Sequence, residues 1–214
     1  MAEPITIGEI FGRLGELLRE NAGLAAVCVA GLTAINIGLD AVSTGNVMTL
    51  PAGLISLGAQ YYLIATVLER LGLREPGGRN RFGAFWALNF VSGLGLLLGY
   101  LLLILPGLYL SARWMVASPA FLAEDKGVND ALGESWAITQ PSFWAILGTL
   151  LVIFVPTCAI GFGLSLAFET LLPVLATAIL YAFLFGAFVL SWMASVATYS
   201  LLRPGPQHLA EVFA

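Results

Sequence analysis

The chain has 214 residues, of which 59% are hydrophobic and only 10% are charged, and its net charge is -4. Soluble domains carry about 25% charged residues, so this composition excludes a water-soluble globular protein. The acidic balance also disfavours nucleic acid as a partner. We therefore expect an all-α integral membrane protein.

The N-terminal segment predicts an amphipathic interfacial helix over residues 5–20. Apolar side chains recur at helical spacing between Ile7 and Leu18, and acidic and basic side chains occupy the opposite face. A helix of this kind lies in the plane of the membrane interface. It lacks the basic start and apolar core of a signal peptide, so we expect it to be retained.

Long apolar runs with few charged residues predict six transmembrane helices. A bilayer core of roughly 30 Å needs about 20 apolar residues per helix. The predicted spans cover about 22–40, 48–70, 84–105, 107–123, 143–168 and 172–201. The fourth is the shortest, and Pro106-Gly107 marks the turn before it. Residues 204–214 form a tail after the last span.

The positions of Lys and Arg predict the orientation of these spans. Cations precede the first span and follow the second, fourth and sixth: Arg13, Arg19, Arg70, Arg74, Arg79, Arg81, Lys126 and Arg203. The connections after the first, third and fifth spans contain none. This pattern predicts that both termini are cytoplasmic. Lys126 fits it only if 107–123 crosses the membrane, which favours six spans over five.

A second interfacial helix is predicted at 127–140, where the apolar spacing of residues 5–20 recurs. Gly8 and Phe11 also correspond to Gly83 and Trp86 in the second cytoplasmic segment. The chain is then either three repeats of an interfacial helix with a transmembrane hairpin, or a chance match between apolar helices.

The sequence contains no catalytic constellation. His208, in the tail, is the one histidine, which excludes a histidine-based metal site or triad. No predicted span holds two acidic residues, while Gln60 and Asn89 place isolated amides within spans. We expect no enzymatic activity, no cofactor and no metal.

Arg113 is the exception, because it is a full cation within a predicted span. Such a residue costs about 2.5–3.5 kcal/mol on insertion scales, so it should face protein, water or a headgroup. Asp40 and Glu169 are the acidic residues predicted on the same outer side. These three residues form a candidate intramembrane polar site. Arg113 either makes a structural ion pair with one acid or binds an outer-leaflet phosphate.

The segment LPGLYLSARWMVASPAFLAEDKGVNDALGESWAITQPSFW carries a resemblance. It resembles the membrane domain of bacterial glycerophosphoryl diester phosphodiesterases, as in stand-alone YciC-like multi-span proteins. The matching positions are Pro106, Gly107, Tyr109, Arg113, Trp114, Pro119, Glu124, Ser135, Trp136 and Thr139. The resemblance implies a bacterial inner-membrane protein concerned with lipid or envelope homeostasis. No segment outside the predicted spans is long enough for the soluble catalytic domain, so it does not imply phosphodiesterase activity.

Two functions are compatible with these features. The first is a non-enzymatic membrane scaffold or lipid-homeostasis protein, with membrane lipids, other membrane proteins or a second copy of the chain as partners. The alternative is a small transporter or channel for a lipid-like or small amphipathic substrate. A polar cavity that reaches Arg113 would favour transport, whereas a packed apolar interior would favour scaffolding.

Overall fold

The computed structural model describes residues 4–42, 49–74, 80–168, 170 and 172–203. The described part is built of α-helices and contains no strand, which confirms the all-α class. The predicted tail at 204–214 and the predicted site residue Glu169 lie outside these residues. The helices are α1 (Ile7–Glu20), α2 (Ala22–Val42), α3 (Thr49–Arg70), α4 (Phe82–Leu102), α5 (Ile104–Arg113), α6 (Ala117–Ala123), α7 (Val128–Thr139), α8 (Phe143–Phe168) and α9 (Pro173–Leu202).

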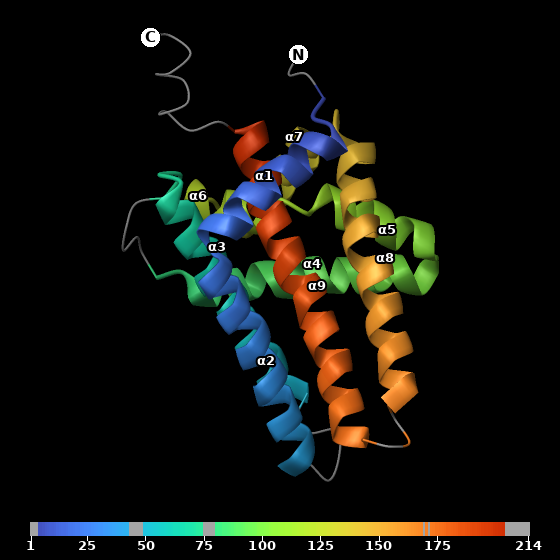
Figure 1. Ribbon diagram of the computed structural model, residues 1–214. Helices are drawn as coiled ribbons and strands as arrows, with labels where there is room; N and C mark the ends of the chain where they lie inside the picture. The colour runs from blue at the N-terminus through green and yellow to red at the C-terminus, as the bar shows by residue number, and fades with distance from the viewer. Residues whose placement is uncertain (1–3, 43–48, 75–79, 169, 171, 204–214) are drawn as a thin grey trace.

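Five of the described helices, α2, α3, α4, α8 and α9, are long and apolar enough to cross a membrane. This agrees with the expectation of an integral membrane protein. Figure 1 shows that α2, α8 and α9 run alongside one another, whereas α4 runs across them. Length and composition therefore select α4 as a span, but its direction differs from that of its neighbours.

The predicted fourth span, 107–123, is not one helix. It consists of α5 and the short α6, separated by a turn at residues 114–116. The Arg113 carbonyl accepts hydrogen bonds from the Ser135 hydroxyl at 2.8 Å and the Thr139 hydroxyl at 3.3 Å. The N–H of Ala117 instead donates to the Trp114 carbonyl at 3.1 Å. In a continuous helix the Ala117 N–H would donate to the Arg113 carbonyl. The hydroxyls of Ser135 and Thr139 donate to that carbonyl instead, and α5 ends there.

Helices α4 and α5 form a tight antiparallel hairpin. The chain reverses at Leu103, whose backbone is extended (φ -165°, ψ 152°). A Cβ on Gly99 would lie 3.1 Å from the Gly107 Cα, and a Cβ on Gly107 would overlap the Tyr100 ring. Pro106 fits in the first turn of α5, where its missing N–H costs nothing. The Pro-Gly turn of the sequence is therefore the start of a returning helix.

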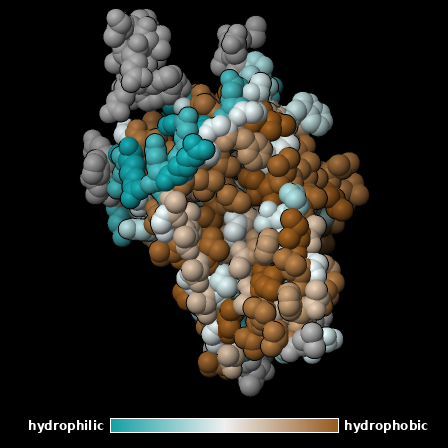
Figure 2. Space-filling model, viewed as in Figure 1, coloured by the Kyte–Doolittle hydropathy of each residue, from teal (hydrophilic) through white to brown (hydrophobic). Residues whose placement is uncertain are grey.

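The tip of this hairpin is apolar and unpacked. Residues 101–105 are all Leu or Ile, and their side chains are 68–78% exposed. The hairpin tip forms the apolar projection at the right of Figure 2. An exposed apolar surface of this kind fits contact with lipid. At its other end the hairpin is closed, because Arg81, before α4, pairs with Asp125, after α6, at 2.8 Å.

Charged groups gather at one end of the helix bundle. Arg13 in α1 reaches Ser200 near the end of α9, and Arg70 at the end of α3 donates to Asn21 before α2 at 2.7 Å. Hydrophilic residues accordingly cover α1 and its surroundings in Figure 2, while the rest of that face is largely apolar. The α4–α5 hairpin leaves and rejoins this charged end.

Helix α1 lies against this charged end. Thr6 and Glu9 form a capping box, in which the Thr6 hydroxyl accepts from the Glu9 N–H and Glu9 accepts from the Thr6 N–H. Ile10 and Leu17 on its apolar face are fully buried. A helix followed by a long hairpin occurs in α1–α3 and in α7–α9, whereas α4 starts directly at Phe82.

Helices α8 and α9 pack closely at Gly161. A Cβ on this glycine would lie 2.5 Å from the Cβ of Phe183, and Phe183 cannot move that atom without moving its backbone. Two residues along, Gly163 is exposed and would place a Cβ in open space. Alanine substitutions at these two glycines therefore compare a packed position with an open position in the same helix.

We predict that Gly161→Ala separates α8 from α9 and lowers the free energy of unfolding by about 1–3 kcal/mol, the usual cost of overpacking. Gly163→Ala should leave stability unchanged or raise it by up to about 1 kcal/mol, because alanine favours the helix. Unfolding of the purified protein in mixed detergent micelles, followed by circular dichroism, measures both. Equal stability of the two variants would contradict the close approach.

Candidate functional site

A cavity of about 1020 Å³ lies among α3, α4, α5, α6, α8 and α9. Most of its lining is aliphatic or aromatic, including Trp86, Trp114 and Phe188. The polar groups on its wall are Ser56, Gln60, Asn89, Ser92, Tyr100, Ser111, Ser118, Ser191 and Ser195. None of the described residues that line it is charged. Its volume is at the upper end of the range for small-molecule sites, about 300–1,000 Å³.

Most of these polar side chains are already hydrogen-bonded within their own helices. Ser56 donates to the Ala52 carbonyl at 2.9 Å, and Ser92 donates to the Leu88 carbonyl at 2.8 Å. The Asn89 amide donates to the Phe85 carbonyl at 3.0 Å. A buried polar group that is satisfied in this way can face an apolar ligand without a large desolvation cost. The cavity is thus suited to hydrocarbon with few polar atoms.

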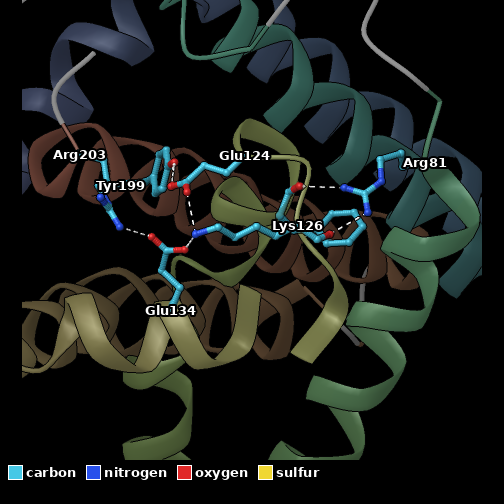
Figure 3. Close-up of polar contacts among 7 residues, drawn as sticks. Arg81, Glu124, Lys126, Glu134, Tyr199 and Arg203 are labelled. Atoms are coloured by element: carbon cyan, nitrogen blue, oxygen red, sulfur yellow. Dashed lines mark hydrogen bonds and ion pairs between the residues drawn. The ribbon is translucent and has the colours of Figure 1, made fainter. Parts of the chain in front are cut away.

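A network of ion pairs lies at the charged end of the bundle (Figure 3). Glu134 of α7 pairs with Lys126 and with Arg203, and its side chain is only 9% exposed. Lys126 also pairs with Glu124 at 2.7 Å, and the Tyr199 hydroxyl donates to Glu124 at 2.7 Å. These contacts join α7, the α6–α7 connection and the end of α9.

Arg81 extends the same network to the start of α4. Besides its pair with Asp125, it donates to the Lys126 carbonyl at 2.7 Å. Its guanidinium lies 4.3 Å from the centroid of the Phe121 ring. Arg81 therefore links the start of α4 to the connection between α6 and α7.

The network favours the ionised form of Glu124. Burial alone would raise the pKa of this carboxyl group. Hydrogen bonds from Lys126 and Tyr199, with the positive charges of Lys126 and Arg203, outweigh burial and lower the pKa below its usual value. Glu124 is therefore a carboxylate at neutral pH, as its two hydrogen bonds require.

Arg113 lies apart from both features. Its side chain faces α7, the residue is 4% exposed, and its Nε is buried without a hydrogen-bond partner. The guanidinium carbon lies 4.6 Å from the Trp136 ring centroid and 5.6 Å from that of Tyr109. Such cation–π contacts partly compensate a cation for its lost hydration.

The predicted partner Asp40 is elsewhere. Arg113 makes no ion pair with an acidic residue in the part of the chain that the structure describes. Asp40 lies near the end of α2, where it accepts a hydrogen bond from Tyr181, and Figure 1 places that end far from α5. The structure therefore replaces the expected carboxylate with aromatic rings. Because Glu169 lies outside the described residues, that pairing stays a prediction.

The residues that carry the sequence resemblance come together around α5. Tyr109, Arg113 and Trp136 form one cluster, and Ser135 and Thr139 bind the Arg113 carbonyl. The remaining positions have separate roles. Trp114 lines the cavity, Pro119 is buried in α6, Glu124 belongs to the ion-pair network, and Pro106 and Gly107 begin α5.

The cavity and the network were not predicted as sites. Gln60 and Asn89 did mark two wall positions, because amides within spans are unusual. Tyr199 and Glu134 gave no comparable signal, since their partners are distant in sequence.

A family model described as the membrane domain of glycerophosphoryl diester phosphodiesterase matches residues 89–203, which is more than half of the chain. The match covers most of α4 and the whole of α5 to α9, and so includes the Arg113 cluster and much of the cavity wall. It agrees with the resemblance found in the sequence. No curated protein and no solved structure matches the chain.

We predict that Glu134→Gln lowers the free energy of unfolding by about 1.5–3 kcal/mol, the usual value of hydrogen bonds to charged groups. Lys126 and Arg203 would lose the negative charge that they share. Glu16→Gln is the control, because Glu16 pairs with Arg13 at the surface, where such pairs are worth about 0–1 kcal/mol. Thermal unfolding in detergent measures both, and equal losses would contradict a central role for Glu134.

Proposed function

We propose a function on the premise that the chain belongs to this family, the membrane domain of glycerophosphoryl diester phosphodiesterase. The protein is a non-enzymatic protein of the bacterial cytoplasmic (inner) membrane. It binds membrane lipid between its helices and serves lipid or envelope homeostasis. Its charged end faces the cytoplasm.

The cavity among α3, α4, α5, α6, α8 and α9 carries this proposal. Its volume of about 1020 Å³ is at the upper end of the range for small-molecule sites. Its walls are apolar, and several of its hydroxyl and amide groups are hydrogen-bonded within their own helices. A lipid acyl chain has the matching chemistry, because it is long, uncharged and already concentrated in the surrounding bilayer.

The proposed absence of catalysis is supported by the nature of the cavity wall. General acid–base or metal-assisted chemistry needs carboxylates, histidines or other titratable groups near the reacting atoms. Tyr100 is the one such group on the described wall, and its hydroxyl is shared with Ser111 at 3.0 Å. The wall is therefore suited to retaining a ligand.

The orientation is supported by the distribution of charge. Arg13, Arg70, Arg81, Lys126 and Arg203 make their contacts at one end of the bundle. Lys and Arg accumulate on the cytoplasmic side of inner-membrane proteins. Helix α1 and the end of α9 lie together at this end, because Arg13 reaches Ser200.

A transporter of lipid-like substrates is the second candidate, and the size of the cavity favours it. Transport also requires a route between the two membrane faces. Arg113 is not on the cavity wall, so the polar path that would have favoured transport is not seen in the described residues. Lipid binding without transport is the function that we prefer.

We predict that Gly53→Trp reduces the lipid that co-purifies with the protein by about tenfold, which corresponds to about 1.4 kcal/mol of binding free energy. Gly53 lines the cavity, and a Cβ added to it would have no atom within 4 Å, so a large side chain there would occupy cavity space. Gly38→Trp is the matched control, since Gly38 is an exposed glycine of α2 with equally open surroundings.

Native mass spectrometry of the proteins released from detergent measures the retained lipid. Equal lipid retention by both variants and the unchanged protein would contradict binding in the cavity. Lipid movement in reconstituted vesicles distinguishes the two functions: a rate above that of empty vesicles, lost in Gly53→Trp, would favour the transporter.

A further inference from the structure

The Arg113 cluster occupies the side of α5 that faces away from the cavity. Leu108 and Ser111 point to the cavity, whereas Tyr109 and Arg113, one turn apart, contact α7. The cluster is thus separate from the proposed lipid cavity. An inference about it does not depend on the cavity being occupied.

The guanidinium of Arg113 has unused hydrogen-bonding capacity. Its Nε is buried with no partner, and no described acidic residue neutralises its charge. The aromatic rings of Tyr109 and Trp136 contact the cation but accept no conventional hydrogen bond from it. Within the described residues, neither the Tyr109 hydroxyl nor the Trp136 indole N–H is hydrogen-bonded. The guanidinium, the phenol and the indole of this cluster therefore carry donors without an acceptor among the described residues.

The aromatic residues around Arg113 indicate its depth in the membrane. Tyr109 and Trp136 are 40% and 37% exposed, so the rings that contact the guanidinium also reach the protein surface. Phe143 packs against Tyr109 at 5.1 Å, and the strongly exposed Trp144 follows at 5.0 Å. Exposed Tyr and Trp concentrate at the level of lipid headgroups. The exposed aromatic side chains around Arg113 therefore fit a position at headgroup level.

The chemistry of the missing acceptor follows from these donors. A guanidinium matches the oxygens of a phosphate through paired N–H donors and retains its charge at all physiological pH values. A phosphate at this position would also accept from the phenol and the indole. Since the cluster is at headgroup depth, the available phosphate is that of a phospholipid.

We propose that Arg113, Tyr109 and Trp136 bind the phosphate of a phospholipid headgroup on the charged side of the membrane. The phosphate completes the donors that the protein leaves unpaired, and Tyr109 and Trp136 flank the headgroup. This site anchors a particular class of lipid beside α5 and α7. It lies on the side opposite to the outer leaflet considered from the sequence.

The test uses the full chain in neutral detergent with three probes. These are a short-chain phosphatidylglycerol, a diacylglycerol with the same chains, and inorganic phosphate. Isothermal titration calorimetry gives the Kd of each. The variants are Arg113→Gln, which removes the cation, and Arg113→Lys, which keeps the charge without the planar donors. Arg13→Gln is the control, because it removes one charge from an exposed pair on the same side.

We expect phosphatidylglycerol to bind more tightly than the other probes. Arg113→Gln should raise its Kd by at least about tenfold, and Arg113→Lys by less, because the paired guanidinium donors are lost even when the charge is kept. Arg13→Gln should leave it unchanged. Wild-type affinity in Arg113→Gln, or equal affinity for diacylglycerol, would overturn the proposal. Equal affinity for inorganic phosphate would overturn the assignment to a lipid.

A loss of folding in Arg113→Gln would be seen in its circular dichroism spectrum. Arg113→Lys and Tyr109→Phe then decide the question, since the second variant keeps the ring and removes only the hydroxyl donor. Weaker binding of phosphatidylglycerol by both variants supports the phosphate site. Unchanged binding by both would overturn it.

Discussion

The hydrogen bonds from Ser135 and Thr139 to the Arg113 carbonyl determine much of this structure. They end α5 and let the chain turn into α6, so an apolar segment that could have continued across the membrane instead returns. The return brings Glu124 and Lys126 to the charged end, where they meet Glu134 and Arg203. It also leaves α4 lying across the bundle, as one wall of the cavity.

The two polar clusters stabilise this arrangement from different directions. The ion pairs of Glu134 and Glu124 hold the ends of α7 and α9 together, while Arg81 closes the base of the hairpin. The hairpin tip makes no comparable contacts and is covered by apolar side chains. The base of the hairpin is thus held by an ion pair, whereas its apolar tip is exposed and suited to contact with lipid. A fixed base with a free apolar tip is compatible with a protein that organises lipid around itself.

The sequence predicted the helices whose apolar patterns are simple, such as α1, α8 and α9, because hydropathy and helical period depend on local residues. It could not predict the break at Arg113, since hydropathy measures how apolar a segment is and not where its carbonyl groups find partners. Nor could hydropathy show which residues contact the Arg113 side chain. Acidic partners were considered, whereas the observed contacts are with Tyr109, four residues earlier in the same helix, and with Trp136. The cavity depends on six helices at once, so no single stretch predicts it.

We expect the α4–α5 hairpin to enter and leave the membrane on the charged side. Labelling of single cysteines with a membrane-impermeant maleimide tests this topology, in a chain with Cys28 and Cys158 replaced by alanine. Val42→Cys and Asp125→Cys report the two membrane faces, and Leu105→Cys reports the hairpin tip. Val42→Cys and Asp125→Cys should react from opposite sides, and Leu105→Cys should react from neither, because lipid surrounds the tip. Labelling of Leu105→Cys from the same side as Val42→Cys would show instead that the hairpin crosses the membrane.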